Sequence, residues 1–336
     1  MYNIHCQWHP LKTCIVGRTY DPSFFENTPA ADKIAKVCEE TEEDLQSLIT
    51  ILKQFNVEVI RPQIDITDRF ENYDRKTIPR PPIAPRDSLV VIGNKIFEFG
   101  NDHPSIRACV SDTKKSIFSA AKDVLNLPAP SITQLGKDIL VDERCFNRWE
   151  MQWIEKQLPD YRINKISIGG HNDGSFIILK PGVILSMHNT VDWNTHFSGW
   201  KVFESSSDKQ THCKQWLIDS KINQGKWWIP GQEDDTELAS FVDQWLNRWT
   251  GFAAETVFSI NALMLDEKHV VINIGQNRDD IVDFLEENGI TPIVCPQRHQ
   301  YFWDNGIHCM TLDLNREGEM FNLFPNRDSP FICKGY

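Results

Sequence analysis

Residues 261–274 and 279–296, NALMLDEKHVVINI and DDIVDFLEENGITPIVCP, contain a complete structural unit. In the first segment two apolar runs flank a short polar turn, which predicts a β-hairpin. In the second segment apolar residues recur at helical spacing up to a glycine, and a β-branched run follows, which predicts a helix and then a strand. This part of the chain therefore predicts a hairpin, a helix and a third strand in succession.

The same order recurs elsewhere in the chain. Hairpins are predicted in SLVVIGNKIFEF (88–99) and SFIILKPGVILSM (175–187), and helix–strand pairs in DLQSLITILKQFNVEVIRP (44–62) and MQWIEKQLPDYRINKISI (151–168). Repetition of one supersecondary unit indicates an α/β fold built as a toroidal array of ββαβ units, and not a doubly wound sheet. No G-x-G-x-x-G or Walker motif favours a nucleotide-binding fold.

Residues from about 204 to 255 interrupt this repeat. The segment is polar and rich in tryptophan, and ASFVDQWLNRW (239–249) is helical in pattern. We interpret it as an insertion in a single domain that spans residues 1–336. Two interpretations stay open, a lid over the mouth of the array and an extra packing helix, of which the second is the commoner case.

The composition limits the partners of this protein. Its 336 residues carry a formal net charge of −12, with 47 acidic against 35 basic side chains, which argues against nucleic acid or an anionic membrane and favours cationic or zwitterionic small molecules. The start MYNIHCQWHPLK lacks the pattern of a signal peptide, and no apolar run approaches the length that crosses a bilayer. Nine cysteines without framework spacing favour a reducing compartment, so we expect a cytoplasmic protein. No second half follows His5, Cys6 and His9 at zinc-ligand spacing, so no metal is predicted.

A histidine and a carboxylate stand together in GGHNDGSFIILKPG (169–182). If residues 171–173 are extended, His171 and Asp173 project from the same face. The alternative is that both only satisfy backbone groups in a loop, and the spacing alone favours that alternative.

Two further candidates precede predicted strands. Asp87 in APRDSLVVIG is by itself a turn residue or a partner of Arg86, and Cys309 in NGIHCMTLDL is by base rate a buried thiol. His308 would face the opposite side in a strand, so its adjacency to Cys309 does not make it the general base.

These motifs together resemble the guanidino-group-modifying enzymes, the pentein superfamily, and most closely its glycine amidinotransferase branch. The similarity is strongest over SINALMLDEKHVVINIGQNRDDIVDFLEENGITPIVC (259–295) and NGIHCMTLDLNREG (305–318). WHPLKTCIVGR, APRDSLVVIGNKIFE, PDYR and HNDGSFIILKPGVILS match the branch in the same order. The similarity covers roughly two thirds of the chain, outside residues 204–255, and a set of ordered motifs is more specific than any one of them.

The resemblance implies a pentein α/β propeller of five ββαβ units around a pseudo-fivefold axis, which holds the site. It implies that Cys309 attacks a guanidinium carbon, that His171 acts as acid and base, and that Asp87 and Asp173 hold the guanidinium. Ser259 is implied as a weaker substrate-binding candidate. The reaction needs no metal or organic cofactor. The expected partners are small molecules, arginine as donor and an acceptor amine, in a protein that could form a homodimer.

The resemblance leaves rival activities open. A hydrolase of the arginine deiminase type would resolve the same covalent intermediate with water, and a non-catalytic protein would only bind guanidino compounds. A further expectation is that the carboxylates raise the thiol pKa of Cys309 until a cationic substrate offsets their charge.

Two positions depart from the branch. Where the branch has an aspartate that orients the catalytic histidine, PAPSITQLGKDIL (128–140) has Ser131. Where the branch has an arginine that binds a substrate carboxylate, MHNTVDWNT (187–195) has Thr190. A serine cannot stabilise an imidazolium by charge, and a threonine cannot replace a bidentate guanidinium.

Overall fold

The unit predicted for residues 261–296 is present in the computed structural model. β12 (Leu263–Asp266) and β13 (His269–Ile272) pair antiparallel, α9 (Asp279–Glu287) follows, and β14 (Thr291–Val294) pairs parallel with β13. The helix ends where Gly289 adopts a φ of 67°, which a glycine tolerates without strain. The structure describes residues 2–99, 103–110, 117–119, 129–187, 190–205, 226–251, 259–274 and 279–335.

Three more units have the same plan, an antiparallel pair followed by a helix and a parallel third strand. They are β3 (Leu89–Ile92), β4 (Lys95–Glu98), α3 (Pro104–Ala108) and β5 (Ile117–Ser119); β6 (Ile132–Leu135), β7 (Asp138–Asp142), α4 (Arg148–Gln157) and β8 (Arg162–Ile166); and β9 (Phe176–Lys180), β10 (Val183–Met187), α6 (Trp193–His196) and β11 (Lys201–Ser205). β16 (Ile332–Cys333) extends the second of these sheets beside β8. The predicted hairpins and helix–strand pairs are therefore confirmed.

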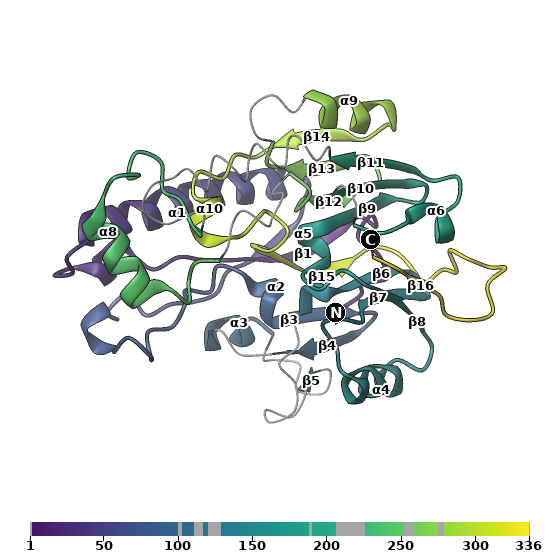
Figure 1. The fold of residues 1–336 in the computed structure, drawn as a ribbon, viewed down its shortest axis with the longest axis horizontal. Coiled ribbons are helices and arrows are strands. Elements are labelled where there is room, and N and C mark those ends of the chain that lie inside the picture. Colours follow the sequence, from purple (N-terminus) through teal and green to yellow (C-terminus); the bar gives the residue numbers. More distant parts are fainter. Residues whose placement is uncertain are drawn as a thin grey trace.

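A fifth sheet joins the two ends of the chain. β1 (Leu11–Val16) pairs antiparallel with β15 (Thr311–Arg316) and parallel with β2 (Glu58–Ile60), and α1 (Ala31–Gln54) connects β1 to β2. This unit begins near the C-terminus and is completed from the N-terminus. In the part of the chain that the structure describes, the sheets form an α/β fold in which β1 and β15 lie between the other sheets (Figure 1).

Short helical segments precede the first strands of three sheets. α2 (Pro85–Ser88) precedes β3, a 3₁₀ turn at Ala129–Ser131 precedes β6, and α5 (Asn172–Ser175) precedes β9. Two further 3₁₀ turns lie at Pro22–Phe25 and Phe70–Asn72, and α10 (Gln300–Trp303) lies ahead of β15. The segments before the first strands carry most of the candidate residues.

The described part of the predicted insertion packs on the core. The helical structure predicted over 239–249 is confirmed as far as Leu246, by α8 (Thr236–Phe241) and the π-helical turn Val242–Leu246. Leu238, Phe241 and Trp249 are buried in one apolar cluster with residues of α1, and Figure 1 shows α8 beside α1 at the same end of the molecule. Residues 206–225 and 252–255 of this prediction lie outside the described residues.

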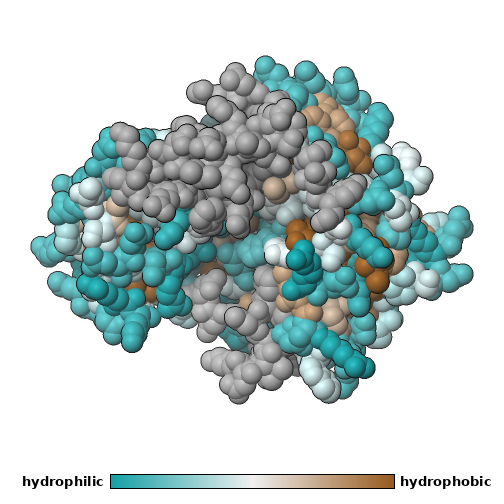
Figure 2. Space-filling view, viewed as in Figure 1, coloured by the Kyte–Doolittle hydropathy of each residue, from teal (hydrophilic) through white to brown (hydrophobic). Residues whose placement is uncertain are grey.

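On the face shown in Figure 2 the coloured residues are mainly hydrophilic, and apolar residues form small separate patches. Among the described helices none combines the length and the apolar character that a bilayer crossing requires.

Candidate active site

Cys309 lies on a helical turn and not in a strand. The amide of Met310 donates to the Gly306 carbonyl (3.1 Å), the amide of Thr311 donates to the His308 carbonyl (3.2 Å), and β15 begins only at Thr311. The expectation that His308 faces away from the cysteine site is therefore wrong, because the alternation of faces applies only to extended backbone. The side chain of Cys309 is buried, with 5% of the residue exposed.

The Asp173 carboxylate lies beside Cys309, but the backbone conformation that places it there differs from the predicted one. The extended geometry expected for residues 171–173 is wrong, because Asn172–Ser175 form one helical turn that closes with a hydrogen bond from Gly174 to the His171 carbonyl. The turn nevertheless directs the Asp173 carboxylate toward the cysteine, with Oδ2 3.5 Å from Cys309 Sγ. The same oxygen lies 2.8 Å from Nδ1 of His308.

The contact between Asp173 and His308 keeps the carboxylate ionised. Burial opposes the charge of Asp173, but the hydrogen bond and the charge of His308, followed by the charges of His171 and Arg86, outweigh burial and lower its pKa to about 2. Burial, and then the charge of Arg86, lower the pKa of His308. Nδ1 of the ring lies 2.8 Å from the Asp173 carboxylate, and Nε2 lies 3.3 Å from the Gln7 amide nitrogen.

Asp87 does not pair with its neighbour Arg86. It forms an ion pair with Arg80 (Nη1 to Oδ2, 3.5 Å), while Arg86 donates to the His308 carbonyl (2.8 Å) and to Asp313 (2.6 Å). The alternative that Asp87 is a partner of Arg86 is therefore wrong. Arg86 instead ties α2 to the turn that carries Cys309.

The thiol of Cys309 is held in its protonated form. Burial raises its pKa well above the ordinary value, and the negative charges of Asp173 and Asp87 raise it further. Hydrogen bonds from the Asn261 side chain and from the backbone of Gly306 act in the opposite direction. The predicted effect of the carboxylates is present, although burial is the larger cause.

His171 is exposed at the start of α5, and its charge acts on the pKa of Asp173. The loop before it is held by Asp142, whose carboxylate accepts from the amides of residues 168, 169 and 170 at 2.6–3.2 Å. Ser131, in the position where the branch has an aspartate, donates to the Gly170 carbonyl (2.9 Å). Ser131 and Asp142 thus position the backbone that precedes His171.

Thr190 and Ser259 are the two remaining positions that the sequence indicated. The Thr190 hydroxyl donates to the Met187 carbonyl (2.8 Å), a contact within its own loop. Ser259 is buried two residues before Asn261.

His308 and Asn261 are the site residues that the sequence did not single out. Asn261 donates to Cys309 Sγ from Nδ2 at 3.0 Å. Asp87, Asp173 and Cys309 stand within three residues of the first strand of a sheet, and Asn261 has the same place before β12. A search for polar residues directly before each predicted hairpin would have found it.

Asp313 is buried between two arginines beneath the Cys309 turn. Its carboxylate binds Arg86 and Arg316, each at 2.6 Å, and Arg316 in turn donates to the carbonyls of His9 and Met264. Burial disfavours the charge of Asp313, but Arg316 and Arg86 outweigh burial and hold its pKa well below the usual range. This network joins the chain ends to α2.

We therefore expect Asp313→Asn to lower the free energy of unfolding by about 3–5 kcal/mol at pH 7, because two buried guanidinium groups lose their counter-charge. The pKa of Asp313 is lower in the folded state, so its contribution is complete above about pH 4 and is lost as the pH falls below that value. Urea unfolding at pH 7 and at pH 3 measures both effects. Exposed Asp160→Asn serves as the control and should change stability by less than about 0.5 kcal/mol. An equal loss in both variants would contradict the role of the network.

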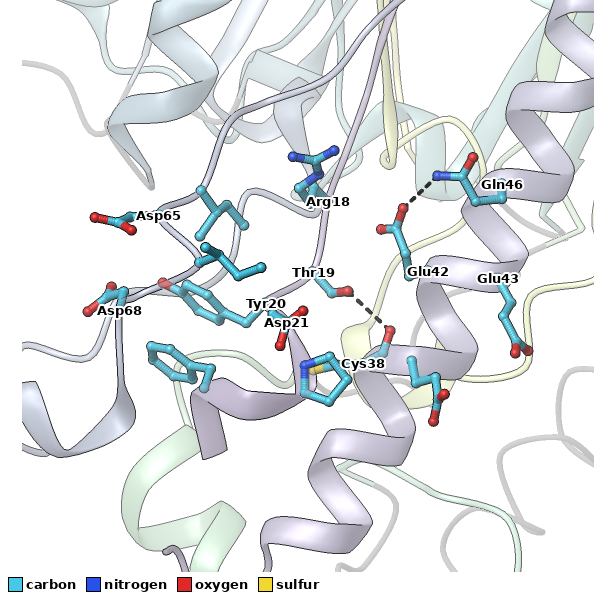
Figure 3. Close-up of a pocket in the computed structure, with 15 residues that line it drawn as sticks. Arg18, Thr19, Tyr20, Asp21, Cys38, Glu42, Glu43, Gln46, Asp65 and Asp68 are labelled. Atoms are coloured by element: carbon cyan, nitrogen blue, oxygen red, sulfur yellow. Dashed lines mark hydrogen bonds between the residues drawn. The ribbon is translucent and has the colours of Figure 1, made fainter. Parts of the chain in front are cut away.

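A separate cavity of about 510 Å³ lies between α1 and the segments that follow β1 and β2. Figure 3 shows Arg18, Glu42 and Asp65 among the residues around it. Its cysteine, Cys38, is buried with a raised pKa, and the Thr19 hydroxyl is bonded to the Cys38 carbonyl at 3.1 Å. The lining contains none of the residues around Cys309, so we place the candidate chemistry at Cys309.

Comparison with known proteins finds similarity to amidinotransferases. The chain is 25% identical to mitochondrial glycine amidinotransferase of Gallus gallus over 95% of this chain and 83% of the relative. It is 24% identical to L-arginine:L-lysine amidinotransferase of Pseudomonas savastanoi pv. phaseolicola over 57% of this chain and 45% of the relative. The structure of SxtG, an amidinotransferase from Microseira wollei in the saxitoxin biosynthetic pathway, superposes with a TM-score of 0.67 at 20% identity, covering 96% of this chain and 99% of that one.

No family model matches the chain. The similarity to the amidinotransferases nevertheless extends over nearly the whole sequence, and the fold agrees with theirs. The chain is therefore similar to glycine amidinotransferase in sequence and to an amidinotransferase of known structure in fold.

Proposed function

We propose that this protein is an amidinotransferase, a transferase that moves the amidino group of arginine to an acceptor amine through a covalent amidino-cysteine at Cys309. The observation that carries the proposal is a buried thiol 3.5 Å from the Asp173 carboxylate and within the field of Asp87. Two negative charges around a thiol are unfavourable for a free nucleophile, but they suit a site whose substrate is a cation. The similarity to the chicken and Pseudomonas amidinotransferases supports the same reaction class.

The carboxylates are proposed to bind the donor guanidinium. Oδ2 of Asp173 is occupied by His308, whereas Oδ1 is buried and accepts no hydrogen bond from the residues that the structure describes. An oriented carboxylate with a remaining acceptor oxygen is suited to a planar guanidinium. Asp87 would accept from a second N–H of the same group. The bound cation would offset the charges that raise the pKa of Cys309, so that the thiolate forms when the donor is present.

The transfer consists of two displacements. In the first, the Cys309 thiolate attacks the guanidinium carbon, a C–S bond forms, and the C–N bond to the departing amine breaks as His171 supplies a proton. In the second, the acceptor amine attacks the amidino carbon, His171 takes its proton, and the C–S bond breaks to restore the thiolate. His171 is exposed and its charge acts on the nearby Asp173, which suits a group that gives a proton in the first displacement and takes one back in the second.

The products formed from arginine test this proposal. Purified protein is incubated with arginine, with and without a panel of amines that begins with glycine, and the products are identified by mass spectrometry. We expect ornithine and a new guanidino compound only when an amine is supplied. Citrulline and ammonia without an acceptor would identify a hydrolase of the arginine deiminase type. Donor binding without any product would identify a non-catalytic guanidino-compound binder.

The remaining predictions belong to the same proposal. The five sheets of the described residues share one plan, which supports a five-unit propeller around the site within a single catalytic domain. Ser259 stays a candidate for donor binding because it is buried next to the Asn261 segment. The cytoplasmic location and a homodimer stay predictions from the sequence.

A further inference from the structure

Asn261 makes three hydrogen bonds that join the two reactive parts of the site. Its Oδ1 accepts from the Cys309 amide, and its Nδ2 donates to Cys309 Sγ and to the Asp173 carbonyl, each at 3.0 Å. A backbone amide can only donate and a carbonyl can only accept, so this network determines which end of the carboxamide points to the sulfur. The residue is completely buried.

Gly306 keeps Asn261 in this position. A Cβ at residue 306 would lie 2.5 Å from Asn261 Cβ and Oδ1, closer than any tolerated contact, so only glycine allows the turn to pack against the carboxamide. The amide of His308 also donates to the Asn261 carbonyl (3.2 Å). The Cys309 turn and the residue before β12 are thus interlocked through both backbone and side chain.

A neutral donor is what this site requires at the sulfur. A lysine or an imidazolium beside Cys309 would stabilise a thiolate, but it would also repel the guanidinium that must bind between Asp87 and Asp173. A carboxamide N–H stabilises the anionic sulfur without adding a positive charge. The backbone hydrogen bond from Gly306 adds a second neutral donor.

We propose that Asn261 is a catalytic residue that stabilises the Cys309 thiolate through its Nδ2–H group, both when sulfur attacks the guanidinium carbon and when it departs from the amidino carbon. The kinetic part of this inference rests on the proposed amidino transfer. In the first displacement the sulfur lone pair becomes the C–S bond, and the hydrogen bond weakens as the charge leaves sulfur. In the second displacement the electron pair of that bond returns to sulfur, and the hydrogen bond strengthens again. Asn261 therefore raises the fraction of Cys309 present as thiolate before the first displacement, and it lowers the barrier of the second, in which negative charge returns to sulfur.

Asn261→Asp tests the inference with almost no change of shape. The variant keeps an oxygen acceptor for the Cys309 amide but loses both N–H donors. Cys309 alkylation by iodoacetamide is followed by peptide mass spectrometry from pH 7 to 11. We expect its midpoint to rise by at least about one pH unit. The kcat should fall by about 10²–10³-fold. The dissociation constant of arginine should stay the same or decrease, because the added carboxylate attracts the arginine cation.

Asn273→Asp is the matched control, since Asn273 is also a buried asparagine but donates to Gln300. It should leave the alkylation profile of Cys309 unchanged. An unshifted profile in folded Asn261→Asp, or equal losses of kcat and arginine binding, would overturn the inference in favour of a structural role. Should Asn261→Asp fail to fold, Asn261→Ser removes the carboxamide without adding charge, and the same upward shift is required.

Alkylation needs no turnover, so the inference and the proposed function can fail separately. A shifted profile in a protein that transfers no amidino group would retain Asn261 as a thiolate donor and would reject the amidinotransferase reaction. An unshifted profile in an active transferase would reject Asn261 as a thiolate donor and would retain the amidinotransferase reaction.

Discussion

Cys309→Ala abolishes amidino transfer in a protein that still folds and still binds arginine. Removing a covalent nucleophile typically costs about 10⁶-fold in kcat, so turnover should fall to the background rate. Arginine binding should persist because Asp173 and Asp87, the proposed guanidinium anchors, are retained. Product formation under saturating arginine measures the first effect, and calorimetric titration with arginine measures the second.

Cys295→Ala controls for the loss of a buried thiol. Cys295 is also buried, and burial raises its pKa to about 11, but it lies at the end of β14 and bonds to Gln297. This variant should keep full turnover. Undiminished turnover in Cys309→Ala would remove Cys309 from the mechanism, and loss of turnover in both variants would point to the fold instead of the nucleophile.

Asp173→Asn is expected to lower kcat/KM by about 10³-fold, because a buried carboxylate that faces a cation contributes several kcal/mol. Both kinetic constants should suffer. The guanidinium loses an anchor, and His308, which donates to Asp173 at 2.8 Å, loses its acceptor charge. Steady-state kinetics over a range of arginine concentrations measures both constants. A change in KM alone would restrict Asp173 to binding.

The stability of Asp173→Asn should also depend on acid pH differently from that of the unsubstituted protein. Asp173 has a pKa of about 2 in the folded protein, below the value of about 4 for an unfolded aspartate. The carboxylate therefore stabilises the fold above about pH 4, and this contribution is lost as the pH falls toward 2. As the pH falls from about 4 to about 2, Asp173→Asn should therefore lose less stability than the unsubstituted protein. Thermal unfolding at several pH values tests this, with exposed Asp160→Asn as the control, and parallel curves for all three proteins would contradict the assignment.

Local patterns in the sequence were sufficient to predict the helices and strands. The spacing of Leu45, Leu48 and Leu52 on α1, and the alternation of apolar runs and glycine turns in the hairpins, depend only on near neighbours in the chain. Burial of one face is decided by such spacing, so the prediction of helices and strands held. The repeat of the unit then indicated the α/β architecture.

The resemblance placed Asp87, Asp173, His171 and Cys309 in one site, but it did not give their geometry. The predicted extended segment at residues 171–173 is a helical turn, and the residues before β15 are a turn as well. Both errors came from extending a strand pattern backward past the first residue that pairs in the sheet. A turn before a strand has no period of two, so sequence spacing could not tell which side chains meet.

What the sequence alone determined about this protein is the set of hairpin, helix and strand units, the family resemblance and the nucleophile candidate. Only the tertiary structure decided that His308 holds Asp173, 135 residues away, and that Asn261 bonds the sulfur of Cys309, 48 residues away. The physical reason is that hydrogen bonds of such side chains depend on how separate units pack, and not on the residues adjacent in sequence. Units brought together by burial of their apolar faces place the residues before their first strands side by side, and the site is formed there.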